Sequence, residues 1–131
     1  KQDIDGRQRG SIVNIASTCG IKALANMASY SASKAALVHF TAAAAMEGAP
    51  LGIRVNAIVP GQVQTAATQD YESRAPDFAA ATTRAIPMQR GGEPDELAEA
   101  IVFMLSSAAS YITGTALPVD GGKAAQLYMP G

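Results

Sequence analysis

The sequence predicts an α/β protein built around a parallel sheet. Short β-branched runs alternate along the chain with longer runs that have helical spacing. The strand-like runs are mostly apolar throughout, which is typical of strands covered on both faces. Gly or Pro turns bound these runs. The order is strand, helix, strand, long polar stretch, helix, strand, and this alternation favours parallel pairing.

Local signals define each predicted element. Pro94 suits the first position of a helix, and Asp95 and Glu96 suit the positive end of its dipole. The polar stretch has no sustained period, and a stretch of that length is usually a lid or a binding loop. One partial domain, residues 1–131, is therefore predicted, with strands at 11–17, 53–59 and 114–119, helices at 29–46 and from 94 onward, and a substrate lid at 62–92.

Composition narrows the classes of function. Lys and Arg total 10 against 11 Asp and Glu, so a nucleic-acid partner has no electrostatic support. No apolar run approaches the ~18 residues of a membrane span, so we expect no membrane partner. The single cysteine, Cys19, excludes an internal disulfide framework and suits a reducing cytosol, which favours a cytoplasmic protein. We assign no metal ligand.

Tyr30 and Lys34 form the first candidate pair. Residues four apart on a helix share one face, so the two side chains are predicted to be neighbours. A free tyrosine has a pKa near ~10, and an ammonium a few ångströms away lowers it by favouring the tyrosinate. Tyr30 would then act as a general acid or base closer to neutral pH. Taken alone, this spacing also fits a surface Tyr and a solvated Lys.

Two strand ends supply further candidates. Ser17 ends the first strand, and open α/β sheets bind ligands outside the carboxyl ends of their strands. Pro60 stops the second strand, and Gly61 permits an unusual backbone or a close ligand approach. The free backbone groups that follow, with the Thr65 hydroxyl, can bind an amide or a phosphate. Taken alone, each of these is also compatible with an ordinary turn or loop.

Together these segments closely resemble the short-chain dehydrogenase/reductase family. The family pattern is Asn-Ile-Ser-Ser at a strand end, then Tyr-x-x-x-Lys, then Asn-Ala-x-x-Pro-Gly-x-x-x-Thr, then Val-Asp-Gly-Gly. Ala16 stands where the family often has its first serine, and Ser17 matches the second, which has the catalytic role. The resemblance extends from Gly10 to Gly122, and its matching segments are 14–17, 30–34, 56–65 and 119–122.

The resemblance implies the C-terminal half of a Rossmann-like doubly wound parallel sheet. It also implies an NAD(P)-dependent oxidoreductase that interconverts a secondary alcohol and a ketone by hydride transfer. In that reading, Tyr30 donates or accepts the hydroxyl proton, and Lys34 lowers the Tyr30 pKa and holds the nicotinamide ribose. Ser17 hydrogen-bonds the substrate oxygen and stabilises its developing charge.

The resemblance extends to the cofactor segment and the lid. Backbone groups of Val63 and the Thr65 hydroxyl would orient the nicotinamide carboxamide, while Pro60 and Gly61 would pass along the ring. Residues 66–90 would close over a small carbonyl or alcohol substrate and exclude water. The Ala-rich helix corresponds to one that usually packs at a subunit interface, which implies a homodimer or homotetramer, although Ala is also the best helix former.

Some family segments do not occur in this sequence. They are the Thr-Gly-x-x-x-Gly-x-Gly turn that places cofactor phosphates at a helix N-terminus, an Asn-Asn-Ala-Gly segment and a helix asparagine. We expect these to precede Lys1 in the full protein, the first strand to leave an open edge, and these 131 residues to be inactive alone. The choice of NAD or NADP depends on that absent half. A non-catalytic binding or scaffolding member of the family and a self-standing small α/β module are the alternatives.

Overall fold

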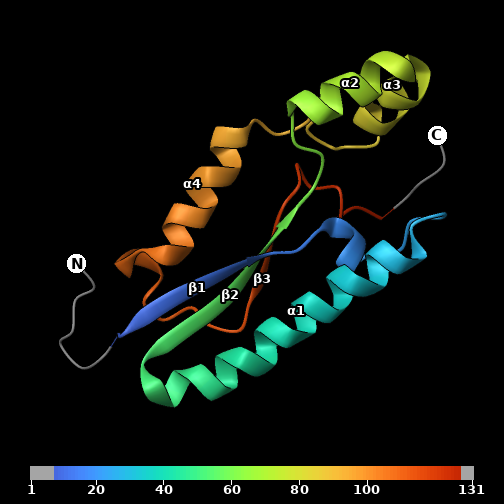
Figure 1. Ribbon diagram of the computed structural model, residues 1–131. Helices are drawn as coiled ribbons and strands as arrows, with labels where there is room; N and C mark the ends of the chain where they lie inside the picture. Colours follow the sequence, from blue (N-terminus) through green and yellow to red (C-terminus); the bar gives the residue numbers. More distant parts are fainter. Residues whose placement is uncertain (1–7, 128–131) are drawn as a thin grey trace.

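The computed structural model describes residues 8–127 (Figure 1). Three strands, four α-helices and three short 3₁₀ helices follow one another in these residues. In chain order they are β1 (Gly10–Ile15), η1 (Thr18–Gly20), α1 (Ala28–Gly48), η2 (Ala49–Leu51), β2 (Ile53–Pro60), α2 (Ala66–Arg74), α3 (Pro76–Arg84), α4 (Pro94–Leu105), η3 (Ser107–Ala109) and β3 (Ala116–Val119).

The three strands form one parallel sheet in the order β1-β2-β3. β1 pairs with β2 from Gly10 opposite Ile53 to the end of the strand, and β3 pairs with the second half of β2, where Ala57 lies opposite Ala116. α1 covers one face of the sheet and α4 covers the other (Figure 1). The predicted parallel α/β architecture is confirmed.

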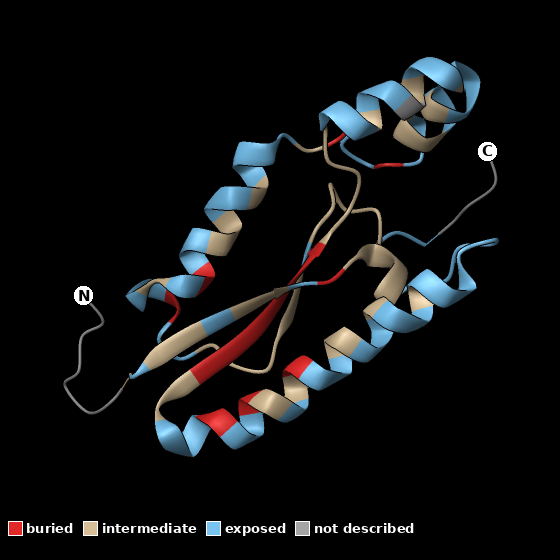
Figure 2. Ribbon diagram, in the orientation of Figure 1, coloured by how far each residue is buried: buried red, intermediate tan, exposed pale blue. Residues whose placement is uncertain are grey.

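β2 is the centre of the core. Its apolar residues alternate between the two helix layers: Ala57 and Val59 belong to a cluster with residues of α1, whereas Ile58 packs with Met104 of α4 and Ala109. Figure 2 shows the buried residues concentrated along this strand. The sequence pattern of a strand covered on both faces is therefore realised fully in β2, because both of its neighbours and both helix layers are present.

Two polar side chains of β2 are buried, and each secures a loop end. Arg54 donates from Nη1 to the Met104 carbonyl at 2.9 Å, which places its positive charge at the carboxyl end of α4. Asn56 donates to the Ile112 carbonyl at 2.9 Å and accepts from the Thr115 N–H at 3.1 Å. These bonds fix the loop that leads into β3.

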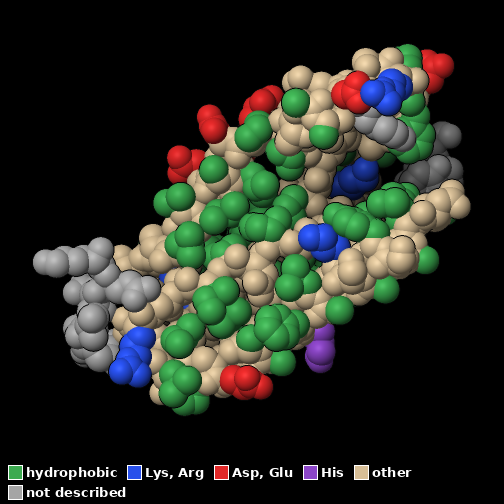
Figure 3. Space-filling model, in the orientation of Figure 1, with side chains coloured by type: hydrophobic (Ala, Val, Ile, Leu, Met, Phe, Trp, Pro, Cys, Tyr) green, Lys and Arg blue, Asp and Glu red, His purple; other side chains and the backbone are tan. Residues whose placement is uncertain are grey.

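β1 is an edge strand. Within residues 8–127 it pairs with β2 alone, so its outer edge has no strand partner. Ile12 and Ile15 on this strand are 49% and 42% exposed. Figure 3 shows hydrophobic side chains gathered on this side of the molecule, between α4 and α1. The open edge expected from the sequence is present, and β1 is only partly covered.

The structure corrects several predicted bounds. The first strand ends at Ile15 and not at residue 17, because the chain turns into η1 at Ser17. The third strand begins at Ala116, two residues after the predicted start, because the preceding loop is bonded to Asn56. The predicted lid at 62–92 contains the two helices α2 and α3, whose short length hid their periodicity. None of the helices in the described part of the chain is long and apolar enough to cross a bilayer.

Candidate active site

Ser17 lies at the carboxyl end of β1, in the turn that begins η1. Its backbone is extended, with φ −168° and ψ 155°, and it is the N-cap residue of η1. The Ser17 Oγ accepts a hydrogen bond from the Cys19 N–H at 3.2 Å. This bond holds the hydroxyl oxygen at the sheet edge and leaves its own hydrogen available for donation.

A close backbone approach joins this turn to α1. A Cβ placed on Gly20 would lie 2.8 Å from both the carbonyl carbon and the carbonyl oxygen of Lys34, and 3.1 Å from the Ala35 nitrogen. These atoms belong to the middle of a helix and cannot move aside independently. Glycine at position 20 is therefore what lets η1 pack directly on the turn of α1 that carries Lys34.

Tyr30 and Lys34 share one face of α1, as their spacing predicts. The Lys34 Nζ lies 5.8 Å from the centroid of the Tyr30 ring. The same ammonium donates to the Ile15 carbonyl, the last of β1, at 3.0 Å. An ammonium has three N–H donors, so two remain after this bond. Lys34 thus links the helix that carries Tyr30 to the strand end that precedes Ser17.

Gly61 does not have the unusual backbone that the sequence allowed, but it lies in a close backbone contact. A Cβ on Gly61 would lie 2.7 Å from the Asp120 Cβ and 2.8 Å from its Cα, and the Gly61 N–H donates to the Val119 carbonyl at 3.0 Å. Gly61 is also absent from the residues with positive φ. The glycine is required here because the ends of β2 and β3 approach each other closely, a reason that the sequence did not reveal.

Val63 forms an isolated parallel bridge with Gly92, at the two ends of the segment that contains α2 and α3. The Gly92 N–H donates to the Gln62 carbonyl at 2.9 Å, and the Gln64 N–H donates to the Gly92 carbonyl at 2.8 Å. The Val63 N–H makes no hydrogen bond among residues 8–127. The backbone donor of Val63, in the predicted cofactor segment, is therefore free within these residues.

Thr65 and Thr68 form a local cap at the start of α2. The Thr65 Oγ accepts from the Thr68 N–H at 3.2 Å, and the Thr68 hydroxyl lies 2.9 Å from the Val63 carbonyl. The Thr65 hydroxyl thus has a structural partner in addition to any ligand. Thr68 ties the first turn of α2 back to the Val63 backbone, and the Thr-x-x-Thr spacing is the signal that could have revealed this.

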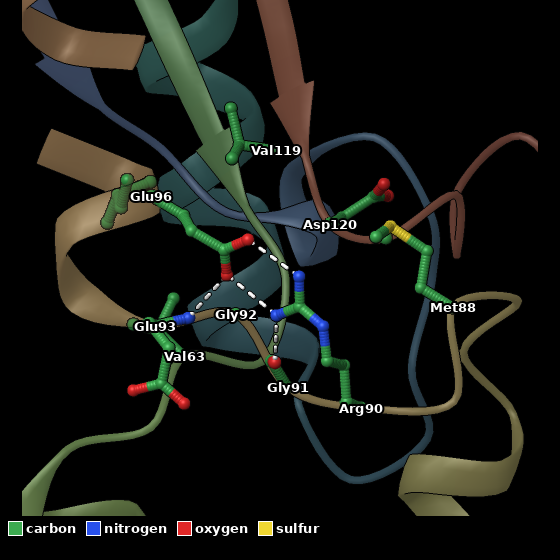
Figure 4. A pocket seen from close by; sticks show the side chains of 11 residues that line it. Val63, Met88, Arg90, Gly91, Gly92, Glu93, Glu96, Val119 and Asp120 are labelled. Carbon is green, nitrogen blue, oxygen red and sulfur yellow. Dashed lines mark hydrogen bonds and ion pairs between the residues drawn. The ribbon is translucent and has the colours of Figure 1, made fainter. Parts of the chain in front are cut away.

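The charged pair Arg90 and Glu96 lines a small pocket beside Val63 (Figure 4). The guanidinium donates two hydrogen bonds to the carboxylate, at 2.7 and 2.6 Å, and the Glu93 N–H donates to the same carboxylate at 2.8 Å. The Arg90 bonds, and next the Glu93 N–H, lower the pKa of Glu96 to about 2. The carboxylate of Glu93 points away from the pair (Figure 4).

Comparison with known proteins assigns the chain to a family. Residues 4–124 match the protein family described as enoyl-(acyl carrier protein) reductase. The chain belongs to the short-chain dehydrogenase/reductase family. Acetoacetyl-CoA reductase of Allochromatium vinosum is 43% identical over 113 residues, which make up 86% of this chain and 45% of that protein.

Solved structures of this family share the fold. A variant of actinorhodin polyketide ketoreductase with NADPH has a TM-score of 0.82 and 36% identity, and the match covers 88% of this chain and 47% of that one. NAD⁺-bound xylitol dehydrogenase has a TM-score of 0.81 and 35% identity, with 86% and 48% covered. The prediction of part of a Rossmann-like doubly wound sheet is confirmed, and the chain spans less than half the length of these relatives.

The residues predicted from the family pattern form two groups in the structure, both at the carboxyl ends of the strands. Ser17, Tyr30 and Lys34 form the first, joined by the packing of η1 on α1. Pro60 to Thr65 form the second, as one continuous segment after β2. The described residues contain no group of three or more His, Cys, Asp or Glu side chains that could hold a metal. The arrangement offers a hydroxyl, a phenol, an ammonium and a free amide.

Proposed function

We propose that this chain is the catalytic half of an NAD(P)-dependent oxidoreductase that interconverts a secondary alcohol and a ketone. One observation carries the proposal: a single ammonium, that of Lys34, is bound to the strand end beside Ser17 and lies 5.8 Å from the Tyr30 ring. It thereby holds the phenol-bearing helix against the hydroxyl-bearing turn. The membership of the family and the oxidoreductase relatives support the same reaction class.

The residues present fit the nicotinamide end of a dinucleotide. The two remaining N–H donors of Lys34 suit the hydroxyls of a ribose, and the unpartnered Val63 N–H suits a carboxamide oxygen. The Thr65 hydroxyl stands two residues further along the same segment. When bound, the nicotinamide supplies or takes up the hydride. Relatives with NADPH and with NAD⁺ support either form of the cofactor.

The chain's own residues then bind the substrate oxygen and transfer its proton. In the reducing direction Tyr30, which is 41% exposed, donates its phenol proton to the ketone oxygen as that oxygen becomes an alcohol. The positive charge of Lys34 stabilises the tyrosinate that remains. Ser17 donates a hydrogen bond to the same substrate oxygen, because its Oγ already accepts from Cys19. Oxidation of the alcohol reverses each step.

α2 and α3 serve in this proposal as the substrate lid within residues 62–92. They extend beyond the carboxyl end of the sheet, above the site (Figure 1). The bridge between Val63 and Gly92 ties the two ends of this segment together, which suits a lid that moves as a unit. Its opening and closing would admit a small carbonyl or alcohol substrate and exclude water.

The proposal also concerns the whole protein. The 131 residues should be inactive alone, because the open edge of β1 and the lack of a glycine-rich phosphate turn leave the dinucleotide without most of its binding site. Phe40 and Met46 on the Ala-rich α1 are 60% and 64% exposed, which supports a homodimer or homotetramer. The single thiol supports a cytoplasmic location.

The test is Tyr30→Phe in the full-length protein, measured as ketone reduction with NADH and NADPH. Turnover should fall by about 10²–10⁴-fold, because only the transferable proton is removed, while cofactor binding stays within about twofold. Tyr111→Phe is the matched control, since Tyr111 is fully exposed on the loop before β3, at the other end of the sheet. If Tyr30→Phe turns over within a few-fold of the unmodified enzyme, the assignment is wrong.

A further inference from the structure

A cavity opens directly beside the Ser17 turn, outside the pocket of Figure 4. It measures about 300 Å³ and lies where the segment between β1 and α1 meets the segment after β3. A volume of this order is within the range of small-molecule sites. Its lining consists of Thr18, Cys19, Lys22, Ala23 and Leu24 from the first segment and Lys123, Ala124 and Gln126 from the second.

The cavity is continuous with the proposed catalytic turn. Thr18 is the residue next to Ser17, and the Cys19 N–H is the donor that holds the Ser17 Oγ. A substrate whose carbonyl oxygen lies at Ser17 therefore has this cavity as the adjacent space for the rest of its structure. The residues between Ser17 and Tyr30 supply one wall of it.

Two lysines, Lys22 and Lys123, line this cavity from segments far apart in the sequence. Neither Lys22 nor Lys123 makes a side-chain hydrogen bond or an ion pair with any residue of the described chain. No carboxylate lines the cavity. Asp120 lies nearest in sequence, but its two carboxylate oxygens accept the backbone N–H groups of Gly122 and Ala124, at 2.9 and 2.7 Å.

Lys22 is exposed and Lys123 is half-buried, so both ammonium groups are accessible to a ligand in the cavity. Like charges beside one space repel each other, and an anion bound between them relieves that repulsion. Figure 3 shows Lys and Arg side chains in the hollow between the α2–α3 pair and α1, whereas the acidic side chains visible in this view lie elsewhere. The cavity therefore has the charge of an anion-binding subsite.

We propose that the substrate carries an anionic group, a carboxylate or a phosphate, and that Lys22 and Lys123 bind this group while Ser17 and Tyr30 act on the carbonyl. The inference rests on the proposed oxidoreductase function and specifies its substrate class. The ammonium groups act on binding and orientation alone. They take no part in proton transfer, so their removal should raise KM for anionic substrates more than it lowers kcat.

The experiment compares pairs of substrates that differ only in charge. The full-length enzyme is assayed with a series of 3-oxo acids, with their methyl esters, and with ketones that carry a phosphate monoester in place of the acid. The unmodified enzyme should prefer the anionic member of each pair. Its KM for that member should rise with ionic strength, because salt screens exposed charges, while KM for the ester stays constant.

The variants Lys22→Met and Lys123→Met should each lower kcat/KM for the preferred anion by about tenfold, the size of one hydrogen bond to a charged group, and leave the ester unchanged. Lys22→Arg and Lys123→Arg should restore most of the loss. Arg9→Met is the matched control, because it removes an exposed positive charge at the opposite end of β1.

The outcomes separate the two proposals. Equal use of acids and esters, or equal losses on both in the Lys→Met variants, would overturn the anionic subsite and leave the oxidoreductase intact. Turnover of no ketone or alcohol with either cofactor would overturn the oxidoreductase function itself. A preference for the carboxylate or for the phosphate assigns the anion within the supported class.

Discussion

The packing of Gly20 on α1 offers the sharpest test of how the site is held together. In Gly20→Ala the new methyl carbon would lie 2.8 Å from the backbone carbonyl of Lys34, whereas carbon atoms normally pack at about 3.5–4.0 Å. Neither residue can shift by itself, because Gly20 is in a capped turn and Lys34 is in the middle of a helix. The methyl group must therefore push η1 away from α1.

The loss of stability in Gly20→Ala can be estimated by comparison with a second glycine, Gly92. A Cβ on Gly92 would meet its nearest atoms at 3.8 Å, an ordinary contact, and its φ is not positive. Both substitutions reduce the conformational entropy of the unfolded chain to the same extent, which alone would stabilise each protein by about 0.4–1 kcal/mol. The difference between them isolates the overpacking at Gly20, for which we expect about 1–3 kcal/mol of lost stability.

The assay is denaturant unfolding of the full-length Gly20→Ala and Gly92→Ala proteins, followed by fluorescence or circular dichroism. The midpoint should fall in Gly20→Ala at an unchanged slope, since the surface exposed on unfolding stays the same. Cofactor affinity should fall as well, because Lys34 moves with the displaced helix turn. Equal stability of the two variants would show that η1 and α1 do not pack as described.

Two further predictions concern charged groups. Lys34→Met in the full-length enzyme should weaken nicotinamide cofactor binding, measured by titration of the cofactor, by at least about tenfold because a charged hydrogen-bond donor is lost; unchanged affinity would show Lys34 to be only a surface charge. The pKa of Glu96 is lowered to about 2, so its pair with Arg90 stabilises the fold above the ordinary pKa near 4.5, and this contribution is lost as pH falls toward 2. Melting temperature measured across that window should fall more steeply in the unmodified protein than in Glu96→Gln, and parallel curves would refute the pair's role.

The parts of the fold that the sequence predicted well are those with dense, regular patterns. β2 and α4 match their predicted positions closely, because β2 is rich in β-branched residues and stops at Pro60, and α4 begins at Pro94 with Asp95 and Glu96 behind it. Strand ends were less accurate, since a hydrogen bond such as that from the Thr115 N–H to the Asn56 side-chain oxygen decides where pairing begins. α2 and α3 were not foreseen, because nine-residue helices have too few turns to display a period.

In the candidate site too, residues that follow a sequence pattern were predicted, whereas features that depend on individual contacts were not. Ser17, Tyr30 and Lys34 were identifiable because their order and spacing match a family pattern. Three features were not identifiable: the tight contact of Gly20, the hydrogen bond from the Thr68 hydroxyl to the Val63 carbonyl, and the shared cavity of Lys22 and Lys123. Each depends on how residues apart in the chain, or across an irregular turn, are placed in space. No periodicity in the sequence encodes such placement.

The parallel bridge between Val63 and Gly92 has a consequence for how this protein can change over evolution. The bridge joins the two ends of the segment that contains α2 and α3. The segment therefore leaves the sheet at Val63 and returns at Gly92, whatever lies between these two residues. The entropy of closing such a loop changes slowly with its length. Residues 66–85 can therefore be lengthened, shortened or replaced while Ser17, Tyr30 and Lys34 keep their positions. Under the proposed function, reaction chemistry and substrate choice would be inherited as separable parts of one chain.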